Sequence, residues 1–337
     1  MKKKESISLP PAISVVVLTL NEEKTIARCL DSIMNQRLSE SKFETIVVDG
    51  GSEDQTRKIA EHYTSRILLE SRHTFGYARN LGIRSARGEY VAFISADAWA
   101  EPNWLTNICK ALSSQETAGV VGRQVPITSP RWVSKIRSIA FKRTYNGEAR
   151  PMKRGDNFST VNSAYVKRAI LDSGGFDEAL PACEDQDLAH RILQTGLRIT
   201  YDPSVTVHHA AEDSLQGILK KTLRQGIGEG ICSSRYQVWS GRLYLAILIL
   251  LAMMSLTLAL TTDSFRSVAG IIFSSMIALF LLSMTSVAIR VFQETRDWKA
   301  FLGSYLYYPS VAIAELLGFA FGRLTAHRFP SVRVPRT

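Results

Sequence analysis

The sequence predicts an α/β domain with a mainly parallel sheet covered by helices on both faces, followed by transmembrane helices. Two observations support this fold class. Over residues 12–97, runs of β-branched and apolar residues alternate with segments of helical periodicity, which is typical of a parallel sheet between helix layers. Most residues over 243–322, in contrast, are apolar. The 337-residue chain should therefore hold one large soluble domain and a second region of different character.

The expected elements alternate regularly in the first hundred residues. The buried strand AISVVVLTL (12–20) precedes an amphipathic helix over 21–36 that Asn21 can cap. The elements that follow are strands over 43–52, 66–70 and 89–97 and helices over 54–63 and 75–87. Polar clusters end the three long strands, and ligands bind at that edge of an open parallel sheet. One ligand crevice is therefore expected there.

Charge and cysteine content narrow the possible partners. The net charge is +10, and residues 131–154 carry eight Lys or Arg against one acid. A basic stretch beside an apolar region favours anionic lipid headgroups or phosphorylated ligands, although a solvated surface is the plainer interpretation. No nucleic-acid-binding motif is visible, so nucleic acid is not expected as a partner. The four separated cysteines suit a reducing cytosol, and the polar, basic opening residues indicate no cleavable secretory signal.

Three apolar stretches are candidate transmembrane helices. Segments 243–262 and 267–289 contain no charge and are long enough to cross a hydrocarbon core of ~30 Å, with a buried soluble helix pair as the alternative. Segment 300–322 carries Pro309 and Glu315, so a re-entrant or interfacial helix is also open. The basic residues of 290–299 fit the cytosolic side, whereas three spans would place the arginine-rich tail outside.

Three carboxylates cluster in the stretch PACEDQDLAHR, namely Glu184, Asp185 and Asp187. Acids in the first turn of a helix interact favourably with the helix dipole, which is a sufficient structural explanation. Crowded carboxylates also hold their protons more tightly than isolated ones. One of them is therefore a candidate general base.

Five stretches, in order, resemble family 2 glycosyltransferases, which have the GT-A nucleotide-sugar-binding fold. They are SVVVLTLNEEKTIARCLDSI, IVVDGGSED, FGYARNLGIRSARGEYVAFISADAW, GGFDEALPACEDQDLAHRI and YDPSVTVHH. The resemblance spans residues 12–210, and the apolar C-terminal region is similar to that of subfamilies that build exopolysaccharide or lipid-linked glycans. Where the family has two aspartates, this chain has Ser95-Ala96-Asp97, which resembles the rhamnosyltransferase-like branch. The usual Pro-Thr-Tyr-Asn-Glu is replaced by residues 18–22, LTLNE.

The resemblance implies roles for particular residues. Asp185 would be the general base with Glu184 beside it, and Asp97 would hold Mg²⁺ or Mn²⁺ together with His209, with His208 less favoured. The donor would be bound by Thr19, Asn21, Glu22, Asp49, Arg79, Ser95 and Asp97, and the acceptor by Gly174, Gly175 and Asp187. The alternatives are structural: helix caps and turns for the strand-end residues, a surface ion pair for Arg79, a plain loop for the glycines, and an ordinary half-buried histidine.

The implied protein is an inverting glycosyltransferase of the hexosyltransferase class, multi-pass in the cell membrane. Its expected parts are a cytoplasmic catalytic domain (1–211), a basic interfacial segment (212–242), a transmembrane region (243–322) and a basic tail (323–337). Its partners would be a nucleotide-sugar donor, a lipid-linked or nascent polysaccharide acceptor and membrane lipids. Two alternatives stay open. One is a polyprenyl-phosphate glycosyltransferase, against which the His-Arg after the acidic cluster argues mildly. The other is a non-catalytic scaffold, suggested by the missing first aspartate.

Overall fold

The structure is a computed structural model that describes residues 12–38, 42–144, 147–210, 214–236 and 266–330. The chain divides into two compact units. We call residues 12–127 and 141–210 the sheet unit, and residues 128–140 and 214–330 the helical unit. The grouping of residues 128–140 with the helical unit had no counterpart in the sequence-based expectations.

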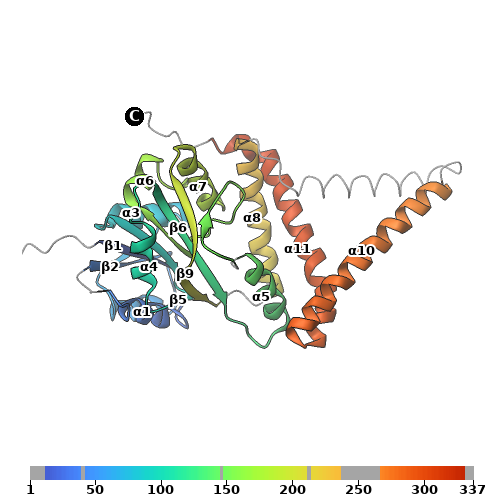
Figure 1. Cartoon of the computed structure of the whole chain (residues 1–337), viewed down its shortest axis with the longest axis horizontal. Helices are drawn as coiled ribbons and strands as arrows, with labels where there is room; N and C mark the ends of the chain where they lie inside the picture. Colours follow the sequence, from blue (N-terminus) through green and yellow to red (C-terminus); the bar gives the residue numbers. More distant parts are fainter. Residues whose placement is uncertain (1–11, 39–41, 145–146, 211–213, 237–265, 331–337) are drawn as a thin grey trace, which may run out of the picture. The chain divides into compact units, whose positions relative to one another are not determined.

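A nine-stranded sheet forms the sheet unit, with strand order β3-β2-β1-β4-β8-β6-β9-β5 and β7 paired with β9 (Figure 1). The strands are β1 (Ile13–Thr19), β2 (Phe43–Asp49), β3 (Ile67–Leu69), β4 (Tyr90–Ser95), β5 (Ala98–Ala100), β6 (Thr117–Pro126), β7 (Arg150–Pro151), β8 (Asn162–Val166) and β9 (Arg198–His209). The first four strands are parallel, as expected. The second half of the sheet is mixed, because β8 runs antiparallel to both β4 and β6. The expectation of a mainly parallel sheet therefore holds only for the first half.

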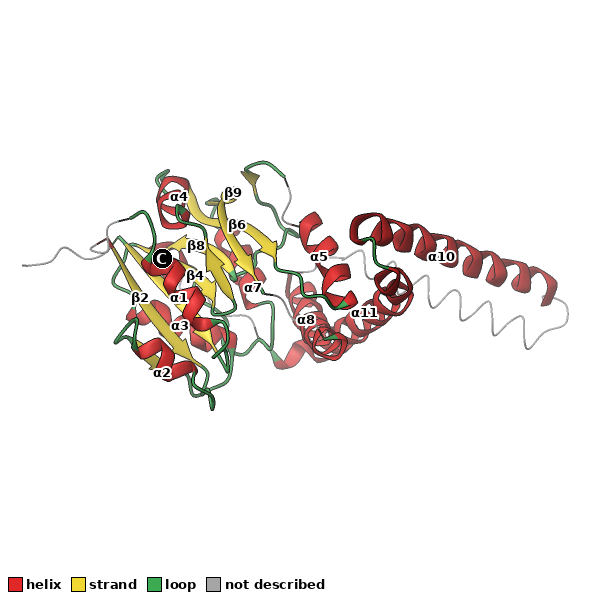
Figure 2. Ribbon diagram, turned by 90° about the horizontal axis from the view of Figure 1, so that it is seen from below, coloured by secondary structure: helices red, strands yellow, loops and turns green. Residues whose placement is uncertain are grey.

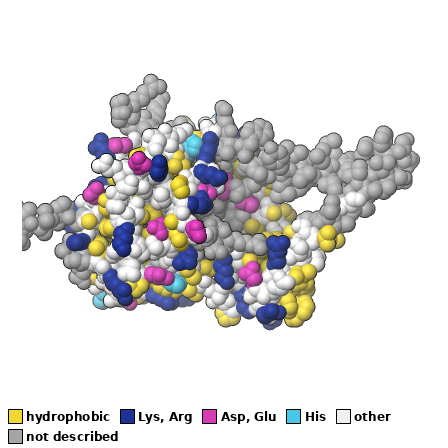
Figure 3. Space-filling view, in the orientation of Figure 1, with side chains coloured by type: hydrophobic (Ala, Val, Ile, Leu, Met, Phe, Trp, Pro, Cys, Tyr) yellow, Lys and Arg dark blue, Asp and Glu magenta, His cyan; other side chains and the backbone are white. Residues whose placement is uncertain are grey.

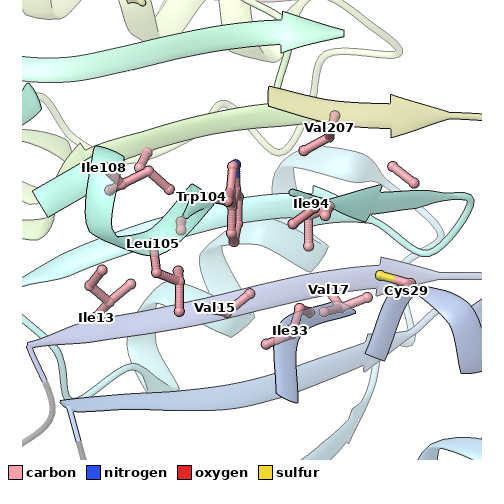
Figure 4. Close-up of a cluster of buried hydrophobic side chains, with 14 of the residues drawn as sticks. Ile13, Val15, Val17, Cys29, Ile33, Ile94, Trp104, Leu105, Ile108 and Val207 are labelled. Carbon is pink, nitrogen blue, oxygen red and sulfur yellow. The ribbon is translucent and has the colours of Figure 1, made fainter. Parts of the chain in front are cut away.

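Helices accompany both faces of this sheet (Figure 2). They are α1 (Ile26–Met34), α2 (Thr56–Glu61), α3 (Phe75–Ser85), α4 (Trp104–Ala111), α6 (Lys167–Asp172) and α7 (Glu184–Gln194). Side chains of α1 and α4 pack with Val15 and Val17 in one buried cluster, in which Trp104 is fully buried (Figure 4). Val16 faces the opposite cluster with side chains of α3, α6 and α7. Successive β1 residues thus alternate between two cores, which explains the continuous apolar run.

The register of β1 with its neighbours aligns three strand ends. Thr19 pairs with Asp49 at the end of β2, and Leu18 pairs with Ser95 at the end of β4. The polar residues after these strands therefore meet at one edge of the sheet, as the sequence predicted.

In its described residues, the helical unit contains α8 (Leu215–Tyr236), α10 (Arg266–Thr295), α11 (Trp298–Thr325), the short η2 (Ala326–Arg328) and the first part of α5 (Trp132–Thr144). Asp297 caps α11, because its carboxylate accepts a hydrogen bond from the Lys299 amide (2.8 Å). The same aspartate pairs with Lys135 of α5 (2.6 Å). Val133, Ile136 and Ile139 of α5 pack with residues of α8, α10 and α11 in a third buried cluster.

The predicted membrane segments have different outcomes. Segment 243–262 lies outside the described residues. Segments 267–289 and 300–322 are helical, within α10 and α11. Among the described residues, however, no helix combines the length and the apolar character that crossing a bilayer requires. The expectation of transmembrane helices over these two segments is therefore not supported.

Candidate functional site

The loops after β1 and β2 are joined by hydrogen bonds at the edge of the sheet. Asn21 has a left-handed backbone (φ 56°), and its amide donates to the Ser52 hydroxyl (2.8 Å) while its side-chain oxygen accepts from the Glu53 amide (2.9 Å). Asp49 is fully buried and accepts from the amide (3.0 Å) and hydroxyl (2.5 Å) of Ser52. The expected contact of Asp49 with the nucleoside does not fit this burial, and the turn alternative does. Thr19 is also buried, with a hydroxyl that has no hydrogen-bond partner among the described residues.

Asp97 and His209 meet although 112 positions separate them in the chain. Asp97 follows β4 and stays partly exposed, whereas His209 ends β9 and is 3% exposed. The His209 Nε2 lies 3.0 Å from an Asp97 carboxylate oxygen. Ala98 pairs with His209 in the sheet, which explains why the two side chains converge.

Glu22 belongs to the same electrostatic neighbourhood. Burial raises the pKa of Glu22, and the negative charges of Asp97 and Asp54 raise it further. A hydrogen bond from Thr25 (2.7 Å) and the proximity of His209 act in the opposite direction. Glu22 thus lies close enough to the Asp97–His209 pair for the charges of both residues to shift its pKa. Ser95, at the end of β4, is also partly exposed at this edge.

His208 lies in a different environment from its neighbour. Its ring stacks on Trp99 (6.2 Å between centroids) and lies 3.5 Å from the Glu101 carboxylate. Because successive strand residues face opposite sides of a sheet, only one of the two histidines can face Asp97. That residue is His209.

The Asp97–His209 pair has the donor chemistry of a small divalent-ion site. A carboxylate oxygen suits Mg²⁺ and Mn²⁺, an imidazole nitrogen suits the softer first-row ions, and the two donor atoms already face each other. No group of three or more His, Cys, Asp or Glu side chains that could hold a metal occurs in the described residues. The pair alone supplies two candidate ligands, so an ion there would need further ligands from elsewhere.

A strained turn starts α7. Cys183 has a left-handed backbone (φ 63°), a conformation that costs a non-glycine residue about 1–2 kcal/mol. The turn places Glu184, Asp185 and Asp187 together in the first turn of the helix. Strain of this kind often occurs at functional sites, where the surrounding structure holds it in place.

The three carboxylates of this turn have three different partners. Glu184 forms a buried ion pair with Arg79 of α3. Asp187 is 1% exposed and pairs with Arg191 one helical turn later (2.6 Å). Asp185 remains partly exposed and accepts from the amides of Gln186 (2.8 Å) and Thr160 (3.4 Å). Only Asp185 therefore offers a carboxylate to an incoming molecule.

Burial raises the pKa of Asp185 to about 6, and the negative charge of Glu184 contributes in the same direction. The guanidinium of Arg79 and the two backbone amides oppose this shift of the pKa. A carboxylate with such a pKa is mostly ionised near neutral pH yet basic enough to accept a proton. The expected crowding by a neighbouring carboxylate thus does raise the pKa of Asp185, but burial raises this pKa more.

Two sequence-based site assignments do not fit these contacts. Asp187 was expected at the acceptor, but its burial and its pairing with Arg191 give it a structural place inside the sheet unit. Arg79 was expected at the donor phosphates, with a surface ion pair as the alternative. The observed ion pair with Glu184 is buried, and it leaves Arg79 between the rings of Phe75 and Phe176 (5.4 Å to each).

The glycine pair before the turn ends a helix. Gly174 and Gly175 have left-handed backbones (φ 84° and 73°), and the Gly175 amide donates to the Ile170 carbonyl (2.9 Å), which caps α6. A side chain on Gly175 would press on the Asn80 amide oxygen. Asn80 itself accepts from the Phe176 amide (2.9 Å) and donates to the Phe176 carbonyl (2.9 Å). Sequence reasoning missed Asn80, although it directly follows Arg79 in the motif FGYARN.

Known proteins match this chain by sequence and by structure. Residues 14–173 match the family described as Glycosyl transferase family 2. Glycosyltransferase AglE of Haloferax volcanii is 29% identical over 238 residues, which cover 68% of this chain and 74% of that protein. O-antigen chain rhamnosyltransferase WbaN of Salmonella anatum is 29% identical over 188 residues, which cover 52% and 59% of the two chains.

A solved structure supports the fold. The mannosyltransferase PcManGT from Pyrobaculum calidifontis, in complex with GDP-Man and Mn²⁺, superposes with a TM-score of 0.59 at 20% identity. The superposition covers 96% of this chain and 91% of that chain. This likeness bears on the fold, and it supports the expected GT-A fold.

Proposed function

We propose that this chain, a glycosyltransferase whose residues 14–173 match family 2, is an inverting enzyme with Asp185 as its general base. It transfers a sugar from a nucleotide-sugar donor to the hydroxyl group of a glycan acceptor. The observation that carries this proposal is the Asp185 carboxylate itself. It is the one carboxylate of the α7 turn that remains partly exposed, and its pKa of about 6 suits proton abstraction.

The proposed reaction is a single displacement. The Asp185 carboxylate accepts the proton of the acceptor hydroxyl while the acceptor oxygen forms a bond to the anomeric carbon of the donor sugar. The bond from that carbon to the nucleoside diphosphate breaks, and its electron pair leaves with the diphosphate. Glu184 is held by Arg79 and does not take part directly, whereas the amides of Gln186 and Thr160 orient the base.

A divalent cation fits the Asp97–His209 pair. PcManGT was solved with Mn²⁺ and a nucleotide sugar, which supports the use of such an ion in this fold. When bound, the ion would neutralise negative charge that develops on the departing diphosphate. Asp97 and His209 would hold it, and Glu22, Thr19 and Asn21 lie on the neighbouring loop at the same strand ends.

The proposed acceptor is lipid-linked or a nascent polysaccharide, and the proposed location is the cytoplasmic face of the cell membrane. The name of the Salmonella anatum relative states that it acts on an O-antigen chain, which is a glycan acceptor. The uncharged segment 243–262 and the surrounding basic residues of the sequence also support a membrane location. The proposed donor sugar is rhamnose-like, because the single aspartate at Asp97 resembles the rhamnosyltransferase-like branch and the Salmonella anatum relative is named a rhamnosyltransferase.

The test compares the wild type with Asp185→Asn in two assays on full-length protein. One assay follows nucleoside diphosphate release from a panel of nucleotide sugars with lipid-linked oligosaccharide or polysaccharide acceptors. The other follows nucleotide binding. Acceptor-dependent release that disappears in the variant, with binding retained, supports the proposal. Transfer to a bare polyprenyl phosphate instead would identify the polyprenyl-phosphate alternative.

A further inference from the structure

One face of α11 is apolar and exposed. Seven large hydrophobic side chains on this helix have exposures from 55% to 77%: Trp298, Leu302, Leu306, Ile313, Leu317, Phe321 and Leu324. Their spacings of three, four and seven residues place them on one side of the helix. We call these seven residues the α11 face. Soluble surfaces rarely expose so long a contiguous apolar stripe, so a covering partner is required.

The opposite side of α11 packs closely against α8. Gly226 and Gly230 of α8 lie against the α11 backbone, and Gly318 and Gly322 of α11 lie against the α8 backbone. At each of these four positions a Cβ atom would overlap a carbonyl oxygen of the other helix. Such a close contact fixes the rotation of α11 about its axis, so the α11 face points outward. Small residues four apart are also the usual means by which helices pair in membranes.

Basic side chains lie at both ends of the α11 face. Arg296 and Lys299 are exposed at its start, Arg290 is exposed in the last turns of α10, and Arg323 and Arg328 are exposed at its end. At the start, the Trp298 ring packs against Phe292 (4.5 Å) and Phe301 (5.3 Å). Figure 3 shows hydrophobic side chains gathered near the junction of α10 and α11, with Lys and Arg side chains beside them. Aromatic and basic residues that flank an apolar stripe match the headgroup region of an anionic bilayer.

We propose that the α11 face binds the surface of a bilayer that contains anionic lipids, with the helix axis parallel to the membrane plane. The apolar side chains enter the boundary between headgroups and acyl chains, and the basic ends contact lipid phosphates. A spanning orientation would bury Glu315 and the basic ends at different depths, whereas the parallel orientation keeps all of these charges in the interface. This proposal rests on the proposed membrane location, and it names the α11 face as the surface of the protein that contacts the membrane.

The experiment measures depth at three positions along α11. Single cysteines replace Leu302, Ile313 and Leu324 in full-length protein that carries Cys109→Ser and Cys232→Ser, because those two native thiols are only partly buried. Each cysteine receives a nitroxide label, and its exposure to oxygen and to a water-soluble nickel complex is measured in phosphatidylglycerol–phosphatidylcholine vesicles. A matched control label replaces Leu171, an exposed leucine of α6 in the sheet unit.

Equal, shallow depths at positions 302, 313 and 324, with position 171 in water, are the expected result. A greatest depth at 313 would show a spanning helix, and full exposure to the nickel complex would show that the face meets no lipid; either result overturns the proposal. Lys299→Gln with Arg290→Gln should weaken the anionic-lipid preference about fivefold for each charge removed. The depth measurement needs no turnover, so Asp185→Asn should leave it unchanged. Failure of this proposal and failure of the catalytic proposal therefore appear in different assays.

Discussion

Arg79 shows how a single side chain can serve a site without touching its ligand. Its guanidinium pairs with Glu184 inside the sheet unit, and its charge also lowers the pKa of the neighbouring Asp185. The two members of the ion pair therefore act on the pKa of Asp185 in opposite directions. The basicity of the proposed base depends on this balance as well as on its burial.

Asp185→Asn should lower the rate of sugar transfer about 10²–10⁴-fold and leave nucleotide binding nearly unchanged. The amide keeps the shape of the side chain but cannot accept the proton. Steady-state rates and nucleotide titrations measure the two effects. Asp172→Asn, at an exposed residue that pairs with Arg168 on α6, is the matched control and should behave as the wild type. Near-normal turnover in folded Asp185→Asn would exclude Asp185 as the base.

The pH profile should report the same carboxylate. Because Asp185 must be ionised to act, and its pKa is about 6, activity should fall as the pH decreases through 6. Glu184→Gln removes a negative charge and leaves the positive charge of Arg79 unbalanced. Both changes lower the pKa of Asp185, so the acidic limb of the kcat profile should move to lower pH. A limb that stays in place or moves to higher pH would contradict the assigned electrostatics.

Activity should also need a divalent cation held through Asp97. We expect loss of transfer in excess chelator, recovery with Mn²⁺ or Mg²⁺, and a higher metal requirement in His209→Ala. Asp97→Ala should abolish turnover. His208→Ala serves as the control, because that ring faces Trp99 and Glu101 instead. Full activity in chelator would mean that charged side chains alone offset the charge of the leaving diphosphate.

The sequence indicated some of the site residues, but it did not indicate which partners the buried charged residues have. Asp97, His209 and Asp185 were identified through motifs that resemble those of a known family, and the variants described above test the roles expected of them. The partners of Arg79, Asp49 and Asp187 were not predictable. Each of these side chains is buried by a contact that depends on how distant elements pack, and residue type alone shows only that a charge needs a partner.

At the scale of elements, local periodicity was a good guide where neighbours in sequence are also neighbours in space. The strands expected over 12–20, 43–52 and 89–97 occur as β1, β2 and β4, and the helix expected over 75–87 occurs as α3. The direction of β8 could not be deduced, because it depends on pairing with β4 and β6 rather than on its own pattern.

The contact between α8 and α11 should be sensitive to the volume of the side chains at its glycine positions. Gly322→Val would force side-chain atoms into the Ile227 carbonyl of α8 and separate the helices. We expect a loss of about 1–3 kcal/mol in the free energy of unfolding of the helical unit. Denaturant titrations followed by helical circular dichroism measure this loss. Leu324→Ala, on the exposed side of the same helix, should change the unfolding free energy little. Equal effects of the two variants would argue against close packing.

At the scale of the whole molecule, the chain builds its second unit from two separate stretches. Residues 128–140 leave the sheet unit, contribute to the helical unit, and the chain then returns to complete the sheet. Nothing in the basic composition of 131–154 predicted this path. The sequence-based boundary at residue 211 treated the first part of the chain as one continuous domain, whereas packing is a property of distant segments that no local pattern reveals.

Trp132→Ala should loosen the helical unit without disabling the sheet unit. The Trp132 ring lies directly against Gly303 of α11, so its removal leaves a gap between α5 and α11. We expect faster proteolysis between residues 128 and 140, with nucleotide binding retained. Leu302→Ala, next to Gly303 on α11, is the control, because that side chain is 65% exposed. Loss of nucleotide binding in Trp132→Ala would show that the two units do not hold their folds separately.

The insertion of residues 128–140 also has a consequence for how the protein is made. Val133, Ile136 and Ile139 emerge from the ribosome early, yet the residues that cover them include Val291, Ala300 and Tyr307. The sheet strands can pair as soon as residue 209 is available, because domains generally fold during synthesis from the N-terminal end. The apolar side of α5 must wait for a further stretch of about a hundred residues. During that interval the apolar side of α5 is exposed on the nascent chain, where a chaperone can bind it.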